Sequence, residues 1–256
     1  MVIRYDAINP ILKVLEETMI NVSNTYVEVE RSGVETAILP VGAIEQHGPH
    51  LPLSVDWAIG EAIALRVAEK LDAFLMPGIA YGCSQAHRGF RGSVYISQET
   101  LGALVKDIAY SLIDQGFRRI AVLNAHGGNL ILKLAVREIN LSQDECKVIL
   151  LFPTNEIDDV RSKILDGGPS DAHAGELETS LMLHLAPSQV GNERVDHIPE
   201  GVSETYFDYT LLKELCPDGI WGRPTLASAE KGEKLMDAIV ERAIVNIETT
   251  FRNLGM

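Results

Sequence analysis

Four apolar runs alternate with helix-like stretches, and this order limits the folds open to the chain more than any other feature of the sequence. The runs cover residues 36–41, 73–77, 119–124 and 146–152, and the helix-like stretches between them cover 57–71, 98–115 and 128–141. Such alternation is typical of βαβ units with parallel strands. The runs are continuously apolar, which indicates strands buried on both faces. We therefore expect an α/β fold, a three-layer α/β/α sandwich with a mainly parallel central sheet.

The remaining segments look helical or irregular. Residues 11–20 and 175–186 have helical spacing, 187–226 is a long excursion punctuated by Pro and Gly, and 227–251 predicts a long terminal helix. An excursion of this length is unusual in a compact domain, so we expect it to cover a site or to form a subunit contact. The length of 256 residues fits a single domain over 1–256.

Charge and cysteine content exclude several classes of protein. The chain has 36 acidic and 22 basic residues, a formal charge of -14, and no basic stretch that would follow a phosphate backbone, so nucleic acid is not an expected partner. No apolar run is long enough to cross a bilayer. The 3 cysteines are far apart and form no CxxC pair, which fits a reducing compartment. We expect a cytoplasmic protein without a membrane partner.

The stretch GAIEQHGPHLPLSVD, residues 42–56, gathers potential metal ligands directly after the first predicted strand. In an extended loop Glu45 and His47 point to the same side and can face one metal centre. Asp56 returns at the start of a helix, where it either bridges two ions or caps the helix. For Gln46 and His50 we expect ordinary loop hydrogen bonds.

The motif NAHGGN, residues 124–129, follows the third predicted strand. Ligands of parallel sheets collect beyond the carboxyl ends of the strands, which favours His126 as a ligand over a hydrogen-bonded loop histidine. Gly127 and Gly128 let the backbone approach a substrate closely, and the following helix offers N–H groups to an anion. Both glycines are expected to bind substrate.

Two further motifs complete the set. In SDAHAGELETS, residues 170–180, a helix beginning near Ala174 would place His173 and Glu176 on one face, with Glu178 pointing some way apart. One of the two carboxylates, Glu176 or Glu178, can reach the site, while the other serves the helix dipole or a neighbour. In GCSQAHRGFRGS, residues 82–93, the loop is expected to face the substrate. Its expected contact residues are Ser84, His87 and Arg91, although a solvated arginine is the common fate in an acidic protein.

These motifs, together with the late GIWGRPTLASAEKG, occur in the order found in the creatininase family, which this chain resembles from Glu35 to about Ile239. The resemblance implies a metal-dependent hydrolase of amide C–N bonds, usually a homo-hexamer. Glu45, Asp56 and His126 would hold one divalent ion, and His47 with the bridging Asp56 a second. A hydroxide bridging the ions would be the nucleophile. His173 would be the proton shuttle to the leaving nitrogen.

The chain departs from creatininase itself within NAHGGN. There creatininase has a tyrosine and a metal-binding glutamate, where this chain has Gly127 and Gly128. We expect Glu176 to replace the lost carboxylate and so to join His173 among the catalytic residues. Arg91 and Arg223 stand where the family more often has Pro and Asp, which hints at an anionic substrate.

The departure also bears on the substrate. Family members with a His-Gly-Gly-Asn loop include enzymes that deformylate a pyrimidine intermediate and others that trim peptide-derived precursors. We therefore expect a small cyclic amide or a formamide, with two ions of Zn, Mn or Fe per subunit. The alternatives are creatinine hydrolysis proper and a non-catalytic protein that binds a small molecule in the same crevice.

Overall fold

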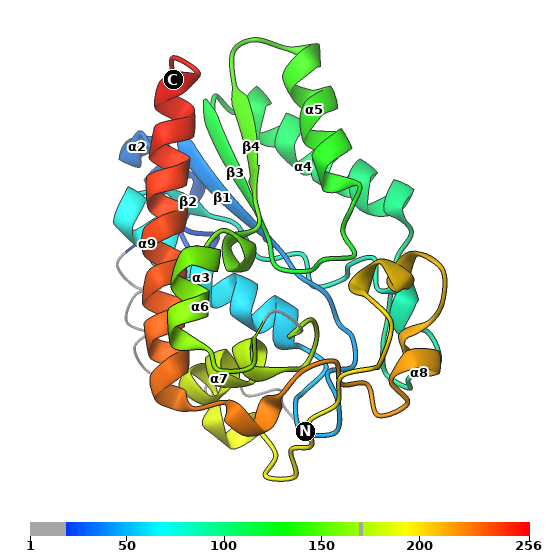
Figure 1. Cartoon of the computed structure of the whole chain (residues 1–256). Helices are drawn as coiled ribbons and strands as arrows, with labels where there is room; N and C mark the ends of the chain where they lie inside the picture. Colours follow the sequence, from blue (N-terminus) through cyan, green and yellow to red (C-terminus); the bar gives the residue numbers. More distant parts are fainter. Residues whose placement is uncertain (1–18, 169–170) are drawn as a thin grey trace.

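The computed structural model of the chain describes residues 19–168 and 171–256 (Figure 1). Its centre is a sheet of 4 strands in the order β2-β1-β3-β4. All neighbouring strands pair in parallel, with Ala37 opposite Phe74 and Ile120, and Ile120 opposite Val148. The strand bounds are β1 Thr36–Val41, β2 Phe74–Leu75, β3 Arg119–Asn124 and β4 Lys147–Leu151.

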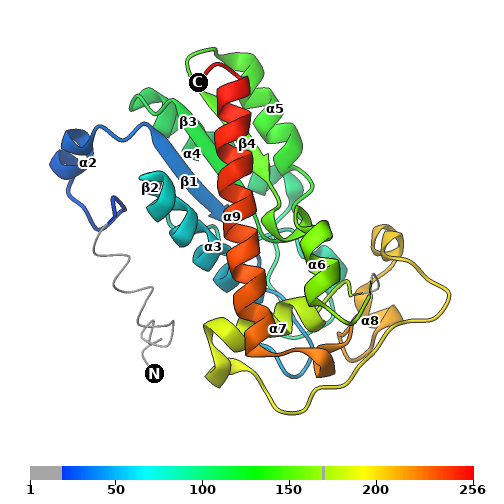
Figure 2. The same cartoon turned by 60° about the vertical axis from the view of Figure 1, so that its left-hand side comes forward.

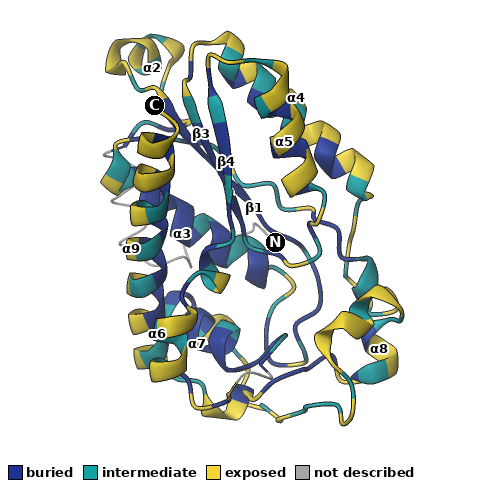
Figure 3. Cartoon of the chain, turned by 45° about the horizontal axis from the view of Figure 1, so that its top comes forward, coloured by how far each residue is buried: buried dark blue, intermediate teal, exposed yellow. Residues whose placement is uncertain are grey.

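Helices cover both faces of this sheet (Figures 1 and 2). On one face lie α4 (Gln98–Asp114) and α5 (Leu132–Ser142), packed on Leu39 and Val122 among other residues. On the other lie α3 (Val55–Leu71), α7 (Glu176–Leu185) and α9 (Ala229–Asn253), packed on Ile38 and Leu123. Successive strand residues therefore enter opposite cores, as the two-residue period of a strand requires. Figure 3 shows the buried strands between helices whose outer faces are exposed. The expected three-layer sandwich is confirmed.

Shorter elements connect these layers. They are α2 (Tyr26–Ser32), η2 (Gln85–His87), η3 (Pro153–Asn155), α6 (Asp158–Ile164), η4 (Pro187–Gln189), η5 (Glu204–Asp208), α8 (Leu212–Leu215) and η6 (Pro224–Leu226). The excursion 187–226 thus contains several short helices but no strand of the sheet. Within the described residues, no helix is both long and apolar enough to cross a membrane.

Two elements differ from the sequence-based expectation. The second strand was expected over 73–77 but pairs regularly only at Phe74–Leu75. Pro77 has no N–H to donate, which fits an edge position, and pairing with β1 resumes at the bridge between Val41 and Ile79. The helix expected over 128–141 begins only at Leu132, because residues 126–131 form a turn closed by Asn129 N–H to His126 O. The helix expected over 11–20 falls almost wholly outside the described residues.

Candidate metal centre

The carboxyl ends of β1 and β3 bring the ligand motifs together. Glu45 follows β1, His126 follows β3, and Asp56 lies in the first turn of α3. The loop after β1 runs so close to α3 that a Cβ on Gly42 would lie 2.6 Å from the Trp57 Cα, so this position requires glycine. Asp56 forms no cap of its own helix, since its carboxylate faces His47 and His126.

The ligand atoms form two groups that share Asp56. Glu45, Asp56 and His126 make one group, and His47, Asp56 and Glu178 the other, each with ligand atoms within 4.8 Å of one another. Asp56 Oδ2 lies 3.2 Å from His126 Nδ1, while Asp56 Oδ1 lies 3.2 Å from His47 Nε2. His126 Nε2 is 3.4 Å from Glu45 Oε2, and His47 Nε2 is 3.8 Å from Glu178 Oε1. The two oxygens of one carboxylate therefore serve two adjacent groups, which is the arrangement of a bridging ligand.

The donor set fits divalent metal ions. Among the described residues, Glu45 Oε2, His47 Nε2, Asp56 Oδ2 and His126 Nε2 are buried without a hydrogen-bond partner. Unpartnered buried polar atoms cost free energy, and their convergence in one cluster is explained by a bound cation. Carboxylate and imidazole ligands suit Zn, Mn or Fe(II).

The electrostatics of the metal-free cluster point the same way. Burial would lower the pKa of His47, but Asp56 and Glu178 raise it to about 10. Burial likewise opposes the charged form of His126, but Glu45 and Asp56 raise its pKa to about 9. Burial raises the pKa of Glu45 and of Glu178 to about 7. Protonated imidazoles thus supply the positive charge that the carboxylates need, a role that metal cations would take over.

The structure places Glu176 away from this cluster, contrary to the sequence-based expectation. Its fully buried carboxylate accepts hydrogen bonds from the backbone N–H groups of Asp166 and Gly167, at 3.0 and 2.6 Å, and forms an ion pair with Lys231. Those partners occupy both of its oxygens. The carboxylate that reaches the cluster comes from Glu178, one of the two alternatives that the motif offered.

His173 lies against the cluster in a fixed orientation. Its backbone forms a two-way bridge with Trp221, with N···O distances of 3.0 and 2.9 Å, so the motif GIWGRP holds HAGE in place. His173 Nε2 is 2.8 Å from the backbone carbonyl of Gln46, which can only accept. The Gln46 side-chain amide nitrogen lies 2.9 Å from the same atom. Because the backbone carbonyl can only accept, we place the proton of the neutral ring on Nε2. In the neutral ring Nδ1 is therefore the proton acceptor.

The surroundings of His173 keep it neutral. Burial, reinforced by the charges of His47 and His87, holds its pKa well below the usual range. Its Nδ1 lies 3.8 Å from Glu45 Oε1, and Glu45, His47 and His173 form a third possible group of ligands. The geometry therefore allows both a proton-accepting role and a ligand role for this histidine.

The residues expected to bind substrate have different fates. His87, Gly127 and Gly128 line the main cavity, and His87 Nε2 lies 3.3 Å from Glu45 Oε1. Ser84 is fully buried and lies outside the cavity wall, where it slightly offsets the burial that raises the pKa of Glu45. Arg91 is exposed and does not itself line the cavity, although other residues of its loop do.

The tight backbone at Gly128 explains why no larger residue can stand there in this arrangement. A Cβ on Gly128 would lie 2.4 Å from the Cys83 carbonyl oxygen and 2.5 Å from His126 Nε2. A side chain at this position would therefore push against a candidate ligand. The cavity side of the loop stays open, and the second group takes its carboxylate from α7 instead.

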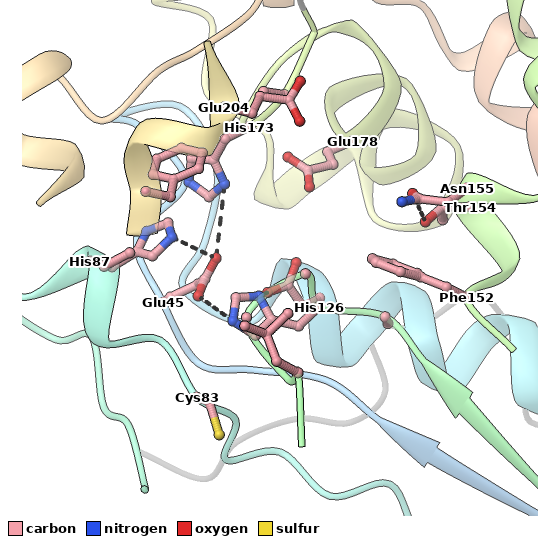
Figure 4. Close-up of a pocket in the computed structure, with 18 of the residues that line it drawn as sticks. Glu45, Cys83, His87, His126, Phe152, Thr154, Asn155, His173, Glu178 and Glu204 are labelled. Carbon is pink, nitrogen blue, oxygen red and sulfur yellow. Dashed lines mark hydrogen bonds and ion pairs between the residues drawn. The ribbon is translucent and has the colours of Figure 1, made fainter. Parts of the chain in front are cut away.

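A cavity of about 490 Å³ opens over the cluster (Figure 4). In the figure Glu45 lies between His87, His126 and His173, and Glu178 faces them from α7. The outer wall includes residues that the sequence did not single out, from the end of β4, from α6 and from η5. They include Phe152, Thr154, Asn155, Arg161, Asp171, Glu204, Phe207 and Asp208. Phe152 follows β4, so it could have been predicted from the rule that ligands bind beyond the carboxyl ends of parallel strands. Asp171 stands within the motif SDAHAGELETS, and the others belong to no motif.

Comparisons with known proteins agree with this geometry. Residues 22–247 match the sequence profile of the creatininase family, described as creatinine amidohydrolase. The creatinine amidohydrolase of Pseudomonas putida is 34% identical over 221 residues, covering 80% of this chain and 85% of that protein. The mycofactocin precursor peptide peptidase of Mycolicibacterium smegmatis is 34% identical over 228 residues, covering 82% of this chain and 83% of that protein.

Solved structures give the same result. A crystal structure of creatinine amidohydrolase (creatininase) superposes with a TM-score of 0.81 and 29% identity, covering 91% of this chain and 98% of the other. Other similar structures of that enzyme are a Zn-Zn type variant, with a TM-score of 0.80, and a Mn form, with a TM-score of 0.81. The match of sequence profile, fold and relatives along most of the chain shows that this protein belongs to the creatininase family.

Proposed function

We propose that this chain is a two-metal amidohydrolase that cleaves a C–N bond of a small cyclic amide, a formamide or a similar compound. The observation that carries the proposal is the sharing of Asp56 between two groups of ligand atoms, completed by Glu45 and His126 on one side and by His47 and Glu178 on the other. This assignment replaces Glu176 by Glu178 and keeps the other expected ligands.

The donor atoms define what the protein contributes to such a site. Zn, Mn or Fe(II) at these positions would supply an activated water and polarise the amide carbonyl. Asp56 would contribute one oxygen to each ion, because its two oxygens face different histidines. Gly127 and Gly128 let the substrate approach the backbone beside His126.

His173 is the proposed proton shuttle. Its Nε2–H is committed to the Gln46 carbonyl, so Nδ1 is the atom that accepts a proton. A buried neutral imidazole can take a proton from the attacking water and donate it to the leaving nitrogen. The pH–rate profile of His173→Ala tests this role, because a profile unchanged from that of the wild type would contradict it.

Creatinine hydrolysis remains a second candidate, favoured by the match to creatinine amidohydrolase over most of both chains. A non-catalytic small-molecule binder is the third. The binder differs from both hydrolases in one respect, since it would hold no stoichiometric metal.

The test combines metal analysis with a substrate panel. Elemental analysis of the purified protein is expected to give two ions per subunit after reconstitution with Zn, Mn or Fe. Hydrolysis is then measured against creatinine, lactams, formamides and short peptides. Chelation should abolish activity, and re-addition of the metal should restore it. Activity that survives chelation, or protein that takes up no metal, would refute the proposal.

We also propose that the protein acts in the cytoplasm as a homo-oligomer, a hexamer by family resemblance. Light scattering coupled to size-exclusion chromatography measures the subunit number. A mass of a single 28.0 kDa chain at micromolar concentration would rule out the oligomer.

A further inference from the structure

Apart from the histidines beside the cluster, Arg161 is the one basic residue among the described residues that line the main cavity. It lies in α6, which follows β4 and η3. Its side chain is 24% exposed, so it is sheltered but reachable from the cavity. Arg91 and Arg223, which the sequence suggested for anion binding, do not line this cavity, and Arg223 donates to the Gly167 carbonyl at 2.7 Å.

The guanidinium of Arg161 is held in place by Asp171 but forms only a long ion pair with it. Its Nη2 donates to the backbone carbonyl of Asp171 at 2.8 Å, which fixes the direction of the group. Its distance to Asp171 Oδ2 is 3.8 Å, beyond hydrogen-bonding range. No other hydrogen bond or ion pair of this guanidinium occurs with the described residues, so most of its N–H donors remain available.

The Asp171 carboxylate does not need Arg161 as a partner. Its Oδ1 accepts from Glu176 N–H at 2.7 Å and from Arg223 N–H at 3.4 Å, and its Oδ2 accepts from Leu177 N–H at 2.9 Å. Those backbone donors satisfy the carboxylate at the start of α7. The Arg161 guanidinium, which lines the cavity and pairs with Asp171 only at 3.8 Å, is therefore available to a ligand.

Arg161 lies close to the cluster of candidate metal ligands. Its anchor, Asp171, precedes His173 by two residues, and two residues span at most about 7 Å. A small molecule bound by Arg161 could therefore reach His173 and the candidate metal ligands with its other end. Phe152 and Phe207 line the same cavity and offer apolar surface to the part of the substrate between these two points.

We propose that Arg161 binds a carboxylate of the substrate, so that the hydrolysed amide belongs to a small molecule that also carries a carboxylate. This inference rests on the proposed hydrolase function for the identity of the reacting bond. A planar guanidinium with a free pair of donors matches a carboxylate in a bidentate arrangement. Glu204 and Asp208, which are exposed and line the outer cavity, disfavour a dianionic phosphate more than a single carboxylate.

The experiment compares matched ligands in matched variants. The ligands are N-acetyl amino acids with one to three methylenes between amide and carboxylate, and the same compounds with the carboxylate replaced by a primary amide. Calorimetry measures their binding to the wild type, Arg161→Met, Arg161→Lys and Arg91→Met. Arg91→Met is the control, because Arg91 is exposed and outside the cavity.

The wild type is expected to bind at least one carboxylate about tenfold to a hundredfold more tightly than its amide counterpart, as a charge-assisted hydrogen bond provides. Arg161→Met should lose this preference, Arg161→Lys should retain part of it, and Arg91→Met should keep all of it. Equal binding of both ligand types, no binding of either, or a loss in Arg161→Met that both types share would overturn the proposal. Tighter binding of a matching phosphonate would overturn the carboxylate assignment.

Each measurement is made on metal-free and on metal-loaded protein, with thermal melting and metal content as further readouts. The preference for carboxylates should persist without metal, because Arg161 contacts no candidate metal ligand. If the protein takes up no metal but still shows this preference, the hydrolase function fails and the carboxylate site stands. If metal uptake and hydrolysis are normal and the preference is absent, only the carboxylate site fails.

Discussion

Glu176 and Glu178 of α7 face different partners, and the backbone conformation of Ala174 helps to explain why. The expectation for Glu176 assumed a helix that begins near Ala174, which would align it with His173. Instead Ala174 adopts a left-handed conformation, with φ of 51°, and the helix begins at Glu176. The reversal turns Glu178 toward the cluster, and its Oε2 accepts the Ala174 N–H at 2.6 Å. A left-handed alanine is rare, so the spacing of residues alone could not reveal it.

The two carboxylates provide a matched pair of variants. Glu178→Gln is expected to reduce the bound metal from about two ions to one per subunit, with an affinity loss for the second ion of at least about tenfold to a hundredfold. Glu176→Gln should keep both ions. It should instead lower the free energy of unfolding by about 1–3 kcal/mol, because Lys231 loses its buried partner. Elemental analysis and denaturant unfolding distinguish the two. Loss of metal in Glu176→Gln with two ions in Glu178→Gln would reverse the assignment.

The raised pKa values of His47 and His126 predict that metal binding releases protons. Both imidazoles are protonated at pH 7 in the metal-free protein, with pKa values of about 10 and about 9. A metal ligand must be neutral, so each ion displaces at least one proton. Affinity should therefore fall about tenfold for each pH unit, below about 10 for the ion at His47 and below about 9 for the ion at His126. Zinc competition with a chromophoric chelator at pH 6.5, 7.5 and 8.5 measures this slope. An affinity independent of pH would contradict the prediction.

At the level of elements, the sequence predicted the order of strands and long helices well because burial leaves a strong periodic signal. The strands β1, β3 and β4 lie within one residue of the expected bounds, and α4 begins where expected, with Ser97 accepting the Thr100 N–H. Short elements depend on tertiary contacts instead. The helices η5 and α8 within 187–226 have too few residues for a period, so neither the place of η5 beside the cavity nor that of α8 against the loop at Gly89 could be predicted.

The start of α7 suggests a test at this scale, because Asp171 caps the helix from outside its first turn. Asp171→Ala removes the acceptor of the Glu176 and Leu177 N–H groups and should lower the free energy of unfolding by about 1–2 kcal/mol. It should also weaken the second ion, since α7 carries Glu178. Ser228→Ala is the control, because Ser228 caps α9 by accepting the Lys231 N–H away from the cluster. Ser228→Ala should lower the free energy of unfolding by a similar amount and leave the metal affinity unchanged. Equal metal affinity in Asp171→Ala and Ser228→Ala would show that the position of α7 does not affect metal binding.

The site as a whole is assembled from segments that are far apart in the chain. Candidate ligands come from the loops after β1 and β3, from the start of α3 and from α7, while the outer cavity adds residues after β4, in α6 and in η5. The rule for parallel sheets predicted from sequence that the loops after β1 and β3 would meet. Arg161 and Phe207 obey no such rule, because their position depends on how α6 and the excursion 187–226 fold back over the sheet. This is why the sequence could predict most of the residues that the structure brings into the cluster, but not those that form the outer wall of the cavity.

Because the ligands come from three separate segments, bound metal should stabilise the entire fold. Ions that bind only the folded chain add about 4 kcal/mol each at a free concentration of about a thousand times Kd. At about 2–4 °C per kcal/mol for a protein of this size, the melting temperature should rise by roughly 10 °C per ion. Differential scanning calorimetry with zinc and with excess chelator measures the shift, and Glu178→Gln should show about half of it. Equal melting temperatures with and without metal would mean that the cluster binds no ions in the folded state. The histidines and carboxylates of the cluster would then pair only with one another.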